Sequence, residues 1–520
     1  MENNPYLIQL QKLIEALHTS EIRLARKHIL AYESNHTTKH RKMFLLFQLI
    51  CHKSRHDYSR IKQKVSPNSN NDSFNRLIKR TINRVYESLM LDVNISRKDA
   101  YNEFFRVQID VRKKLIRAQI LLSKGLIDQA KRNIRLIKRT TKVYELYDEL
   151  VESLFLLQRV YGNAKEFKEF KIVKAEIKRY EHTRKLLLES KSLYHSIKAE
   201  LSTSLVKNKE KRDVFTEIHK LKEYFDETSS YKILSYYLLL MMEFYYMNNQ
   251  YKAEIETGLN FISHLKQQKS IYSKNRISLI YSSLSNSLIG ACDFLNTDKF
   301  ADASIKWAKN NPTLDHLIAL EQKVKALIYL GKHERALEEI ERILSHSLIE
   351  KYPFQKTKAD YFSAVIAFLL CDYKFASRKV YDLGFIEKDK EGWNLWIRLL
   401  RVMISLEKED ISTVDFELES FRKYLERIGV DKSSRMQMIF NVLHQLERND
   451  FDFAATYKKN EINFQLLRSL GKPYKWDSTT AEIVVFHEWF EAKACKREYN
   501  PTFSRYKLDL LPENFELEKI

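Results

Sequence analysis

Two neighbouring stretches of the sequence decide the fold: LIGACDFLNTDKFADASIKWAKNNP at residues 288–312 and KVKALIYLGKHERALEEIERILSH at residues 323–346. Ala303 and Ala336 lie 33 residues apart, and each follows a short break in the pattern by about five residues. Each alanine also has a bulky apolar residue nine positions before it and another four positions after it. Residues three and four apart share one face of a helix. The spacing therefore predicts two helical hairpins of similar build.

The same frame recurs on both sides of this pair. The breaks fall at Asp298 and Gly331, and the bulky neighbours are Phe294, Trp307, Leu327 and Ile340. Further matches are Leu121, Gly125, Ala130 and Ile134 upstream and, more loosely, Ala367, Tyr373, Ala376 and Val380 downstream. A small residue is expected where two antiparallel helices cross closely, and large residues fill the space to the next hairpin. Because one hairpin cannot bury both of its faces, the hairpins are expected to stack.

These residues resemble the tetratricopeptide repeat, a helix-turn-helix unit of about 34 residues. The likeness is good around residues 284–346 and fair around 111–138, and from 360 to 460 the spacing drifts to about 38–40 residues. LIEALHTSEIRLARKHI at 13–29 is also similar to the start of bacterial helical-repeat proteins of similar length. That second likeness implies no activity.

The tetratricopeptide resemblance implies an all-α solenoid of stacked antiparallel helical hairpins. In such a solenoid the first helix of each hairpin lines a concave groove, and extended or helical peptides are its natural ligands. By the 33-residue frame, Glu321, Lys325 and Tyr329 are expected to face that groove. The implied function is a protein-interaction scaffold or adaptor that binds a partner protein or peptide.

The composition indicates helix along the whole chain. Gly occurs 9 times and Pro 7 times in 520 residues, far below average usage of about 7% and 5%. Few tight β-turns are expected, because these two residues supply most turn conformations. We divide the chain into a basic N-terminal helical segment at 1–95, tetratricopeptide-like repeats at 96–475, and a C-terminal helix and tail at 476–520.

The cysteines and the apolar runs bear on the compartment. Cys51, Cys292, Cys371 and Cys495 are far apart and form no CxxC pair, which favours a reducing compartment. The N-terminus lacks the basic start and apolar core of a signal peptide. The most apolar run, Ile233–Met242, has ten residues, whereas a membrane span needs about 20. The sequence predicts a cytoplasmic protein without membrane insertion.

Positive charge is concentrated in the first two fifths of the chain. Residues 1–100 carry +9 and residues 101–200 carry +10, out of a total of +21. Two lines of arginines at helical spacing lie there, Arg76, Arg80 and Arg84, and Arg132, Arg135 and Arg139. Aligned cations can track a phosphate backbone, so an alternative function is a regulator whose basic N-terminal region binds nucleic acid. An ordinary solvated surface accounts for the same charge, and we favour it.

No motif for catalysis or for a cofactor is present. The phosphate-binding patterns GxxxxGK and GxGxxG and the nucleophile pattern GxSxG are all missing. His487-Glu488-Trp489-Phe490-Glu491 resembles the zinc motif HExxH, but Glu491 replaces the second histidine, so too few ligands remain. Two histidine pairs, His36 with His40 and His52 with His56, lie in basic surroundings, and no cluster of Asp or Glu completes a metal site. We therefore expect no enzyme, no catalytic residue, no cofactor and no metal.

Overall fold

The computed structural model is helical throughout the part of the chain that it describes. The described residues are 4–33, 41–51, 58–91, 102–204, 214–308, 313–384, 386, 389, 392–431, 433–471, 473–512, 515 and 517. Helix makes up 79% of the structure, and these residues contain no strand. The all-α class predicted from the scarcity of Gly and Pro is confirmed. The four histidines of the two pairs lie outside the described residues.

The chain divides into two compact units. Unit 1 comprises Met1–Lys142 and Leu146–Ile177, and unit 2 comprises Val143–Glu145 and Lys178–Ile520. The boundary predicted near residue 95 falls at 92–101, which are not described. None of the described helices is both long and apolar enough to cross a membrane.

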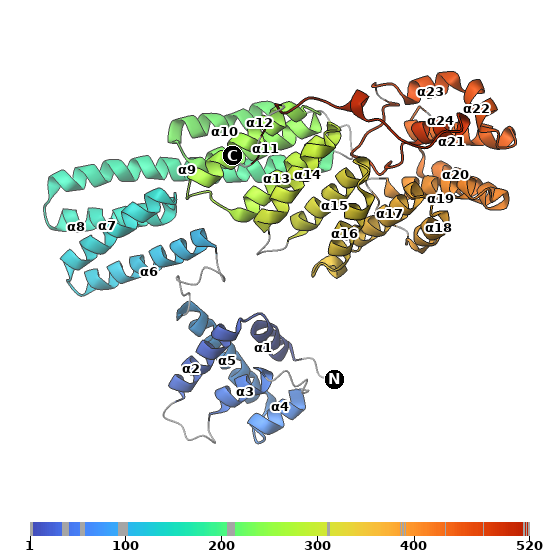
Figure 1. The fold of residues 1–520 in the computed structure, drawn as a ribbon. Coiled ribbons are helices and arrows are strands. Elements are labelled where there is room, and N and C mark those ends of the chain that lie inside the picture. The colour runs from blue at the N-terminus through green and yellow to red at the C-terminus, as the bar shows by residue number, and fades with distance from the viewer. Residues whose placement is uncertain are drawn as a thin grey trace. The chain divides into compact units, whose positions relative to one another are not determined.

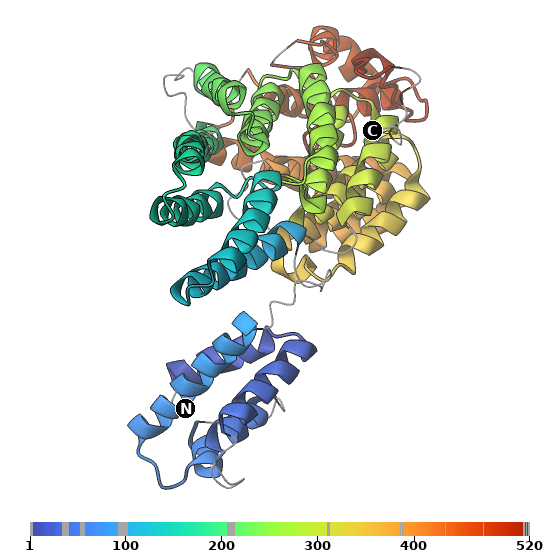
Figure 2. The same cartoon turned by 90° about the vertical axis from the view of Figure 1, so that its left-hand side faces the viewer.

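The first five helices of unit 1 form a cluster with its own core. They are α1 (Pro5–Glu15), α2 (Thr19–Tyr32), α3 (Lys42–Cys51), α4 (Tyr58–Val65) and α5 (Asn71–Leu91). Helices α1, α2 and α3 all pack on α5, around buried residues such as Leu10, Phe47 and Phe74. The five helices stay together in both views (Figure 1 and Figure 2). The predicted N-terminal helical segment thus has a packed interior.

Two hairpins follow in unit 1. Their helices are α6 (Glu103–Ser123), α7 (Ile127–Val143), α8 (Tyr147–Asn163) and α9 (Phe167–Ser204), and α9 continues into unit 2. The first helices are joined by an ion pair of 2.8 Å between Arg112 on α6 and Glu149 on α8. The second helices are joined by an ion pair of 2.5 Å between Lys138 on α7 and Glu176 on α9. Equivalent helices of successive hairpins therefore contact each other.

Unit 2 continues with helices that each pack on the next one in sequence (Figure 1). In addition, α13, α15, α17 and α19 form a row in which each packs on its successor. These elements are α10 (Val214–Thr228), α11 (Tyr231–Met247), α12 (Tyr251–Gln267), α13 (Lys274–Gly290), α14 (Phe294–Ala308), α15 (Leu314–Tyr329), α16 (His333–Leu344), the short turn η2 (Ile349–Lys351), α17 (Pro353–Leu369), α18 (Tyr373–Asp382), α19 (Trp393–Glu407) and α20 (Ile411–Ile428).

A left-handed residue ends the first helix of each hairpin. At Gly331, with φ of 69°, the N–H donates to the carbonyl of Ile328, and the next N–H, of Lys332, donates to that of Leu327. This pair of bonds is the Schellman motif, which satisfies the last carbonyls of a helix. The same motif recurs at Gly125, Lys165, Asn249, Cys292, Cys371 and Glu409. It is a structural mark of the repeat.

These corners correct the 33-residue frame. The interval is 39 residues from Cys292 to Gly331 and 40 residues from Gly331 to Cys371. The break that the frame placed at Asp298 lies at Cys292, because Asp298 is inside α14. Ala303 is therefore not the counterpart of Ala336. Six of the seven residues that stand five positions after a corner are buried, namely Ala130, Glu254, Thr297, Ala336, Ala376 and Val414. Phe170, the seventh, is half-buried, and so is Ala303, which does not stand at such a position.

The C-terminal part closes the end of the row and then returns along it. It contains α21 (Arg435–Arg448), α22 (Phe453–Lys459), α23 (Glu461–Leu467), α24 (Phe486–Ala494) and the short turn η3 (Ser504–Tyr506). The chain beyond α24, dark red in Figure 1, runs back toward earlier hairpins. There the Leu508 N–H donates to the Ala291 carbonyl at 2.9 Å, and the Phe515 ring stacks on Phe300. We call residues 473–485 and 495–517 together the C-terminal segment.

Candidate partner-binding groove

All three residues predicted to line the groove lie on α15. Glu321 and Lys325 border a cavity of about 550 Å³. The helices that line it are α11, α13, α15, α17 and α19, which are the first helices of five successive hairpins. The other lining residues are Tyr246, Asn286, Ile289, Ile318, Gln322, Phe354, Gln355, Lys358, Trp393, Thr479, Thr480 and Ala481. Besides these helices, the C-terminal segment contributes to the wall through Thr479, Thr480 and Ala481.

Tyr329 lies under the C-terminal segment. Its ring stacks on Phe294 with centroids 4.4 Å apart, and it meets Trp476 and Phe503 edge-on at 5.7 and 5.1 Å. Burial raises the pKa of Tyr329 well above its ordinary value, and its hydroxyl is a buried group with no hydrogen-bond partner among the described residues. In this structure Tyr329 belongs to the core, and a partner could not reach it.

Side chains of the first helices bind the backbone of the C-terminal segment. The Lys325 ammonium donates to the Thr480 carbonyl at 2.6 Å, and the Tyr361 hydroxyl of α17 donates to the Ala481 carbonyl at 2.8 Å. In the other direction, the Ser478 hydroxyl donates to the carbonyl of Ile289 at 2.5 Å. The groove is thus partly filled by the protein's own chain, and the cavity is the part that stays open.

The open part of the groove combines a charge pair with aromatic rings. The Lys358 ammonium lies 3.0 Å from the Glu321 carboxylate, 4.4 Å from the centre of the Phe354 ring and 4.9 Å from that of Trp393. Such cation–π contacts hold a buried ammonium in place. Nearby, the Gln355 side-chain oxygen is buried and has no hydrogen-bond partner among the described residues. The cavity therefore offers fixed rings to a ligand, whereas the Gln355 oxygen is not exposed in it.

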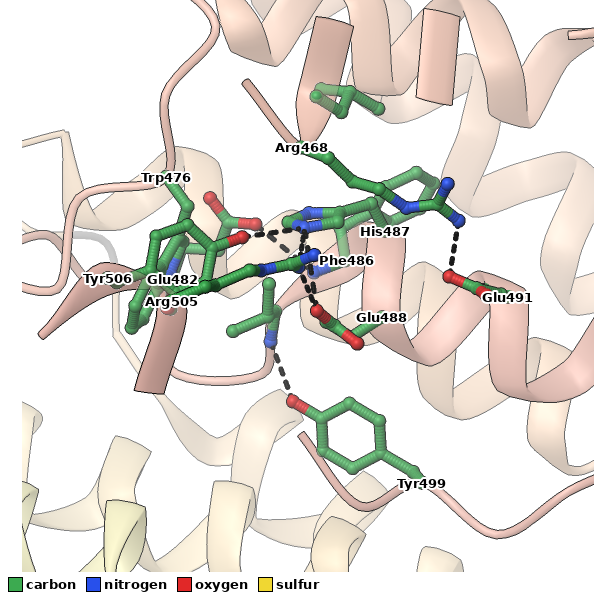
Figure 3. A network of polar contacts seen from close by, with 12 residues as sticks. Arg468, Trp476, Glu482, Phe486, His487, Glu488, Glu491, Tyr499, Arg505 and Tyr506 are labelled. Carbon is green, nitrogen blue, oxygen red and sulfur yellow. Dashed lines mark hydrogen bonds and ion pairs between the residues drawn. The ribbon is translucent and has the colours of Figure 1, made fainter. Parts of the chain in front are cut away.

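A buried polar network fixes the C-terminal segment (Figure 3). Arg435 on α21 donates to both carboxylate oxygens of Glu482, at 2.7 and 2.8 Å, and to the carbonyls of Leu467 and Tyr474. The Trp476 indole N–H donates to the Glu482 carbonyl at 3.1 Å. Arg435 and Glu482 are 8% and 2% exposed. Two-pronged pairing supplies the hydrogen bonds that a buried ion pair requires.

His487, the first residue of the zinc-like motif, is part of the same network. Its Nδ1 lies 3.0 Å from a guanidinium nitrogen of Arg435, and its Nε2 lies 3.1 Å from the Tyr506 hydroxyl. A guanidinium nitrogen of Arg505 also lies 3.3 Å from Nε2, so an arginine, which can only donate, approaches each ring nitrogen. Burial, with Arg435 and Arg505 nearby, lowers the pKa of His487 to about 2, so the ring is neutral. Glu491 is paired with Arg468. Among the described residues no group of three or more candidate metal ligands occurs.

The two arginine lines differ in how they are partnered. On α5, Arg76 and Arg80 are exposed, while Arg84 is paired with Glu87 and lies 3.5 Å from the centre of the Tyr32 ring. On α7, all three arginines are exposed, and none forms an ion pair within the described part of the chain. We call Arg132, Arg135 and Arg139 the α7 stripe.

Reasoning from the sequence missed most of this site. Lys358, Phe354 and Trp393 carried no motif, although their positions on the first helices α17 and α19 follow once the repeat is phased correctly. The docking of the C-terminal segment had no sequence signal at all. No protein-family model, curated protein or solved structure matches the chain.

Proposed function

We propose that the hairpin array of unit 2 is a tetratricopeptide-like solenoid that acts as a cytoplasmic, non-enzymatic scaffold or adaptor. A short segment of a partner protein binds in the cavity that Glu321 and Lys325 border. The observation that carries this proposal is the origin of the cavity wall, because five successive first helices supply most of its residues. A continuous surface built from repeated helices is how solenoids bind their ligands.

The bound C-terminal segment supports a peptide as the ligand. Lys325 and Tyr361 donate to its backbone carbonyls, a mode of binding that depends little on the ligand's sequence. Beside it, Gln355 borders the part of the groove that stays open. The rings of Phe354 and Trp393 offer apolar contact to its side chains.

A site-specific photo-crosslinker tests the proposal. Benzoylphenylalanine is placed at Gln355 in the cavity and, as the matched control, at exposed Arg378 on the second helix α18. In native cells we expect one discrete protein adduct from position 355 and none from 378. Replacing Lys358 with Ala should weaken that adduct. Equal adducts from both positions, or none from 355, would contradict a groove-binding scaffold.

A second candidate function, a regulator that binds nucleic acid through its basic N-terminal region, is favoured by one observation. The α7 stripe is exposed and free of ion pairs within the described chain, whereas Lys131 and Lys138 on the same helix are paired with Glu166 and Glu176. Unpaired arginines at helical spacing can contact successive phosphates. The salt dependence described in the Discussion separates the two candidates.

A further inference from the structure

A second cavity lies along α20, apart from the groove. Its volume is about 420 Å³. Arg398 of α19 forms one wall, and the other wall is one face of α20, made of Phe416, Glu419, Ser420, Lys423, Tyr424 and Arg427. These six positions recur at intervals of three and four, so they share one side of the helix. None of these residues borders the groove cavity.

Positive charge in this cavity exceeds negative charge. Its one carboxylate, Glu419, accepts two hydrogen bonds of 2.8 Å from Arg422 and lies 3.3 Å from Lys423. The bonds from Arg422 lower the pKa of Glu419 to about 2, as expected for a carboxylate whose charge is already compensated. Two arginines of the cavity form no ion pair among the described residues, although the charge of the Glu417 carboxylate acts on one of them, Arg398. These are Arg398 and Arg427.

The two unpaired arginines are held in position by one ring. The guanidinium carbons of Arg398 and Arg427 lie 4.5 and 5.0 Å from the centre of the Tyr424 ring. Arg398 also donates to the Ser420 hydroxyl oxygen at 2.9 Å. Because this oxygen accepts, the hydroxyl hydrogen of Ser420 can point into the cavity as a donor. Two planar cations and one hydroxyl thus line the cavity, and its one carboxylate, Glu419, is already paired with Arg422 and Lys423.

An open aromatic ring stands one helical turn away. The Phe416 side chain is 70% exposed, although it borders the cavity. Residues 416 and 420 are four apart, which corresponds to about 6 Å along a helix axis. A flat group attached directly to an anion bound near Ser420 would therefore reach Phe416. Exposed aromatic rings stabilise ring-bearing ligands by stacking.

We propose that this cavity binds an aryl phosphate, with the phosphate held by Arg398, Arg427 and Ser420 and the attached ring packed on Phe416. A phosphate suits this arrangement because guanidinium groups pair with its oxygens in two-pronged fashion. The cavity volume lies within the range of small-ligand sites, about 300–1,000 Å³. A free aryl phosphate and a phosphotyrosine side chain carry this same chemistry. The proposal does not depend on the function of the groove.

Isothermal titration of the full-length chain with three probes tests this site. The probes are inorganic phosphate, phenyl phosphate and a short phosphotyrosine peptide. We expect phenyl phosphate to bind at least fivefold more tightly than inorganic phosphate. Phe416→Ala should remove that preference and leave the affinity for inorganic phosphate unchanged. Arg427→Ala should weaken every probe at least tenfold. Arg427 is exposed, so this variant should keep its fold, as a thermal melt will check.

A matched control separates the site from general positive charge. Arg378 is also exposed and lies over a ring, 5.1 Å from the centre of Phe375, but it is outside the cavity. Arg378→Ala should leave all affinities unchanged. Absence of binding at millimolar phenyl phosphate, or equal losses in the Arg378 and Arg427 variants, would overturn the proposal. Tighter binding of the peptide than of phenyl phosphate identifies a protein-borne ligand, and equal binding identifies a free one.

Discussion

Glu254 on α12 is a carboxyl group in an unfavourable place. It is 0% exposed, it accepts hydrogen bonds from the Ser283 and Ser287 hydroxyls at 2.9 and 2.5 Å, and it has no ion pair among the described residues. Burial raises its pKa from 4.5 to about 7, although the two hydroxyls oppose the shift. The buried site therefore favours the protonated acid over the carboxylate. We predict that replacing Glu254 with Gln stabilises the protein at neutral and higher pH.

The magnitude follows from the size of the pKa shift. Because the pKa is higher in the folded protein, folding is favoured most below pH 4.5, where both states are protonated. The advantage falls as pH rises and is lost above about pH 7. One pKa unit corresponds to about 1.4 kcal/mol, so the full loss is about 3 kcal/mol. Glutamine carries no charge at any of these pH values. The free energy of unfolding of the Glu254→Gln variant should therefore not decline in this way as pH rises.

Urea unfolding of Glu254→Gln between pH 4.5 and 8 measures the difference. The variant should match the natural protein near pH 4.5 and exceed its free energy of unfolding by about 1–3 kcal/mol at pH 8. Glu256→Gln on the exposed side of the same helix is the control, and its curve should follow the natural protein. A constant offset across the pH range, or no gain at pH 8, would refute the reasoning.

Three further predictions concern the repeat and the basic region. Gly331→Ala should lower the free energy of unfolding by about 1–2 kcal/mol through backbone strain alone, since no atom crowds the new methyl group. Lys165→Gly should raise the free energy of unfolding by about 1 kcal/mol, because it relieves the same strain. Thermal melts of the two variants check both changes. Ala336→Leu should destabilise by about 1–3 kcal/mol through overpacking and Ala303→Leu clearly less, because only Ala336 is fully buried; equal melting temperatures would show that the corrected frame is wrong. If the alternative function holds, reversing the α7 stripe to Glu should weaken binding to random DNA and RNA, and log affinity should fall by several units per log unit of salt; fluorescence anisotropy showing no binding at tens of micromolar would exclude it.

The sequence predicted the helical class correctly and the repeat phase only in part. The helical class follows from the amino-acid composition, to which every residue of the chain contributes. The phase of the repeat depends on single residues at the corners between helices. Of these corner residues, only Gly125 and Gly331 can be recognised from the sequence, because glycine is the usual residue at positive φ. The equivalent corners at Lys165, Cys292 and Cys371 use side chains that seldom adopt this conformation. The frame consequently slipped at Asp298, where no corner exists.

The position of the groove on the first helices could be predicted from the sequence, but the binding of the C-terminal segment in it could not. Glu321 and Lys325 are four apart on one helix, so their common direction follows from helix geometry alone. Tyr329 continues the same line, and nothing local distinguishes it from the other two. Its burial depends on Trp476, which stands far along the chain and carries no periodic signal. Contacts between an array and a non-repeating segment cannot be inferred from periodicity, because they are set by tertiary packing.

The C-terminal segment changes how the hairpin row responds to force and heat. An unattached row of hairpins behaves like a spring, since each unit touches only its neighbours and can open from either end. Here the C-terminal segment is hydrogen-bonded to α13 through Ser478, to α15 through Lys325 and to α17 through Tyr361. Separating these three helices would require all three hydrogen bonds to break together. The row should therefore resist stretching and melt as one cooperative block, with the width of its cavity held constant.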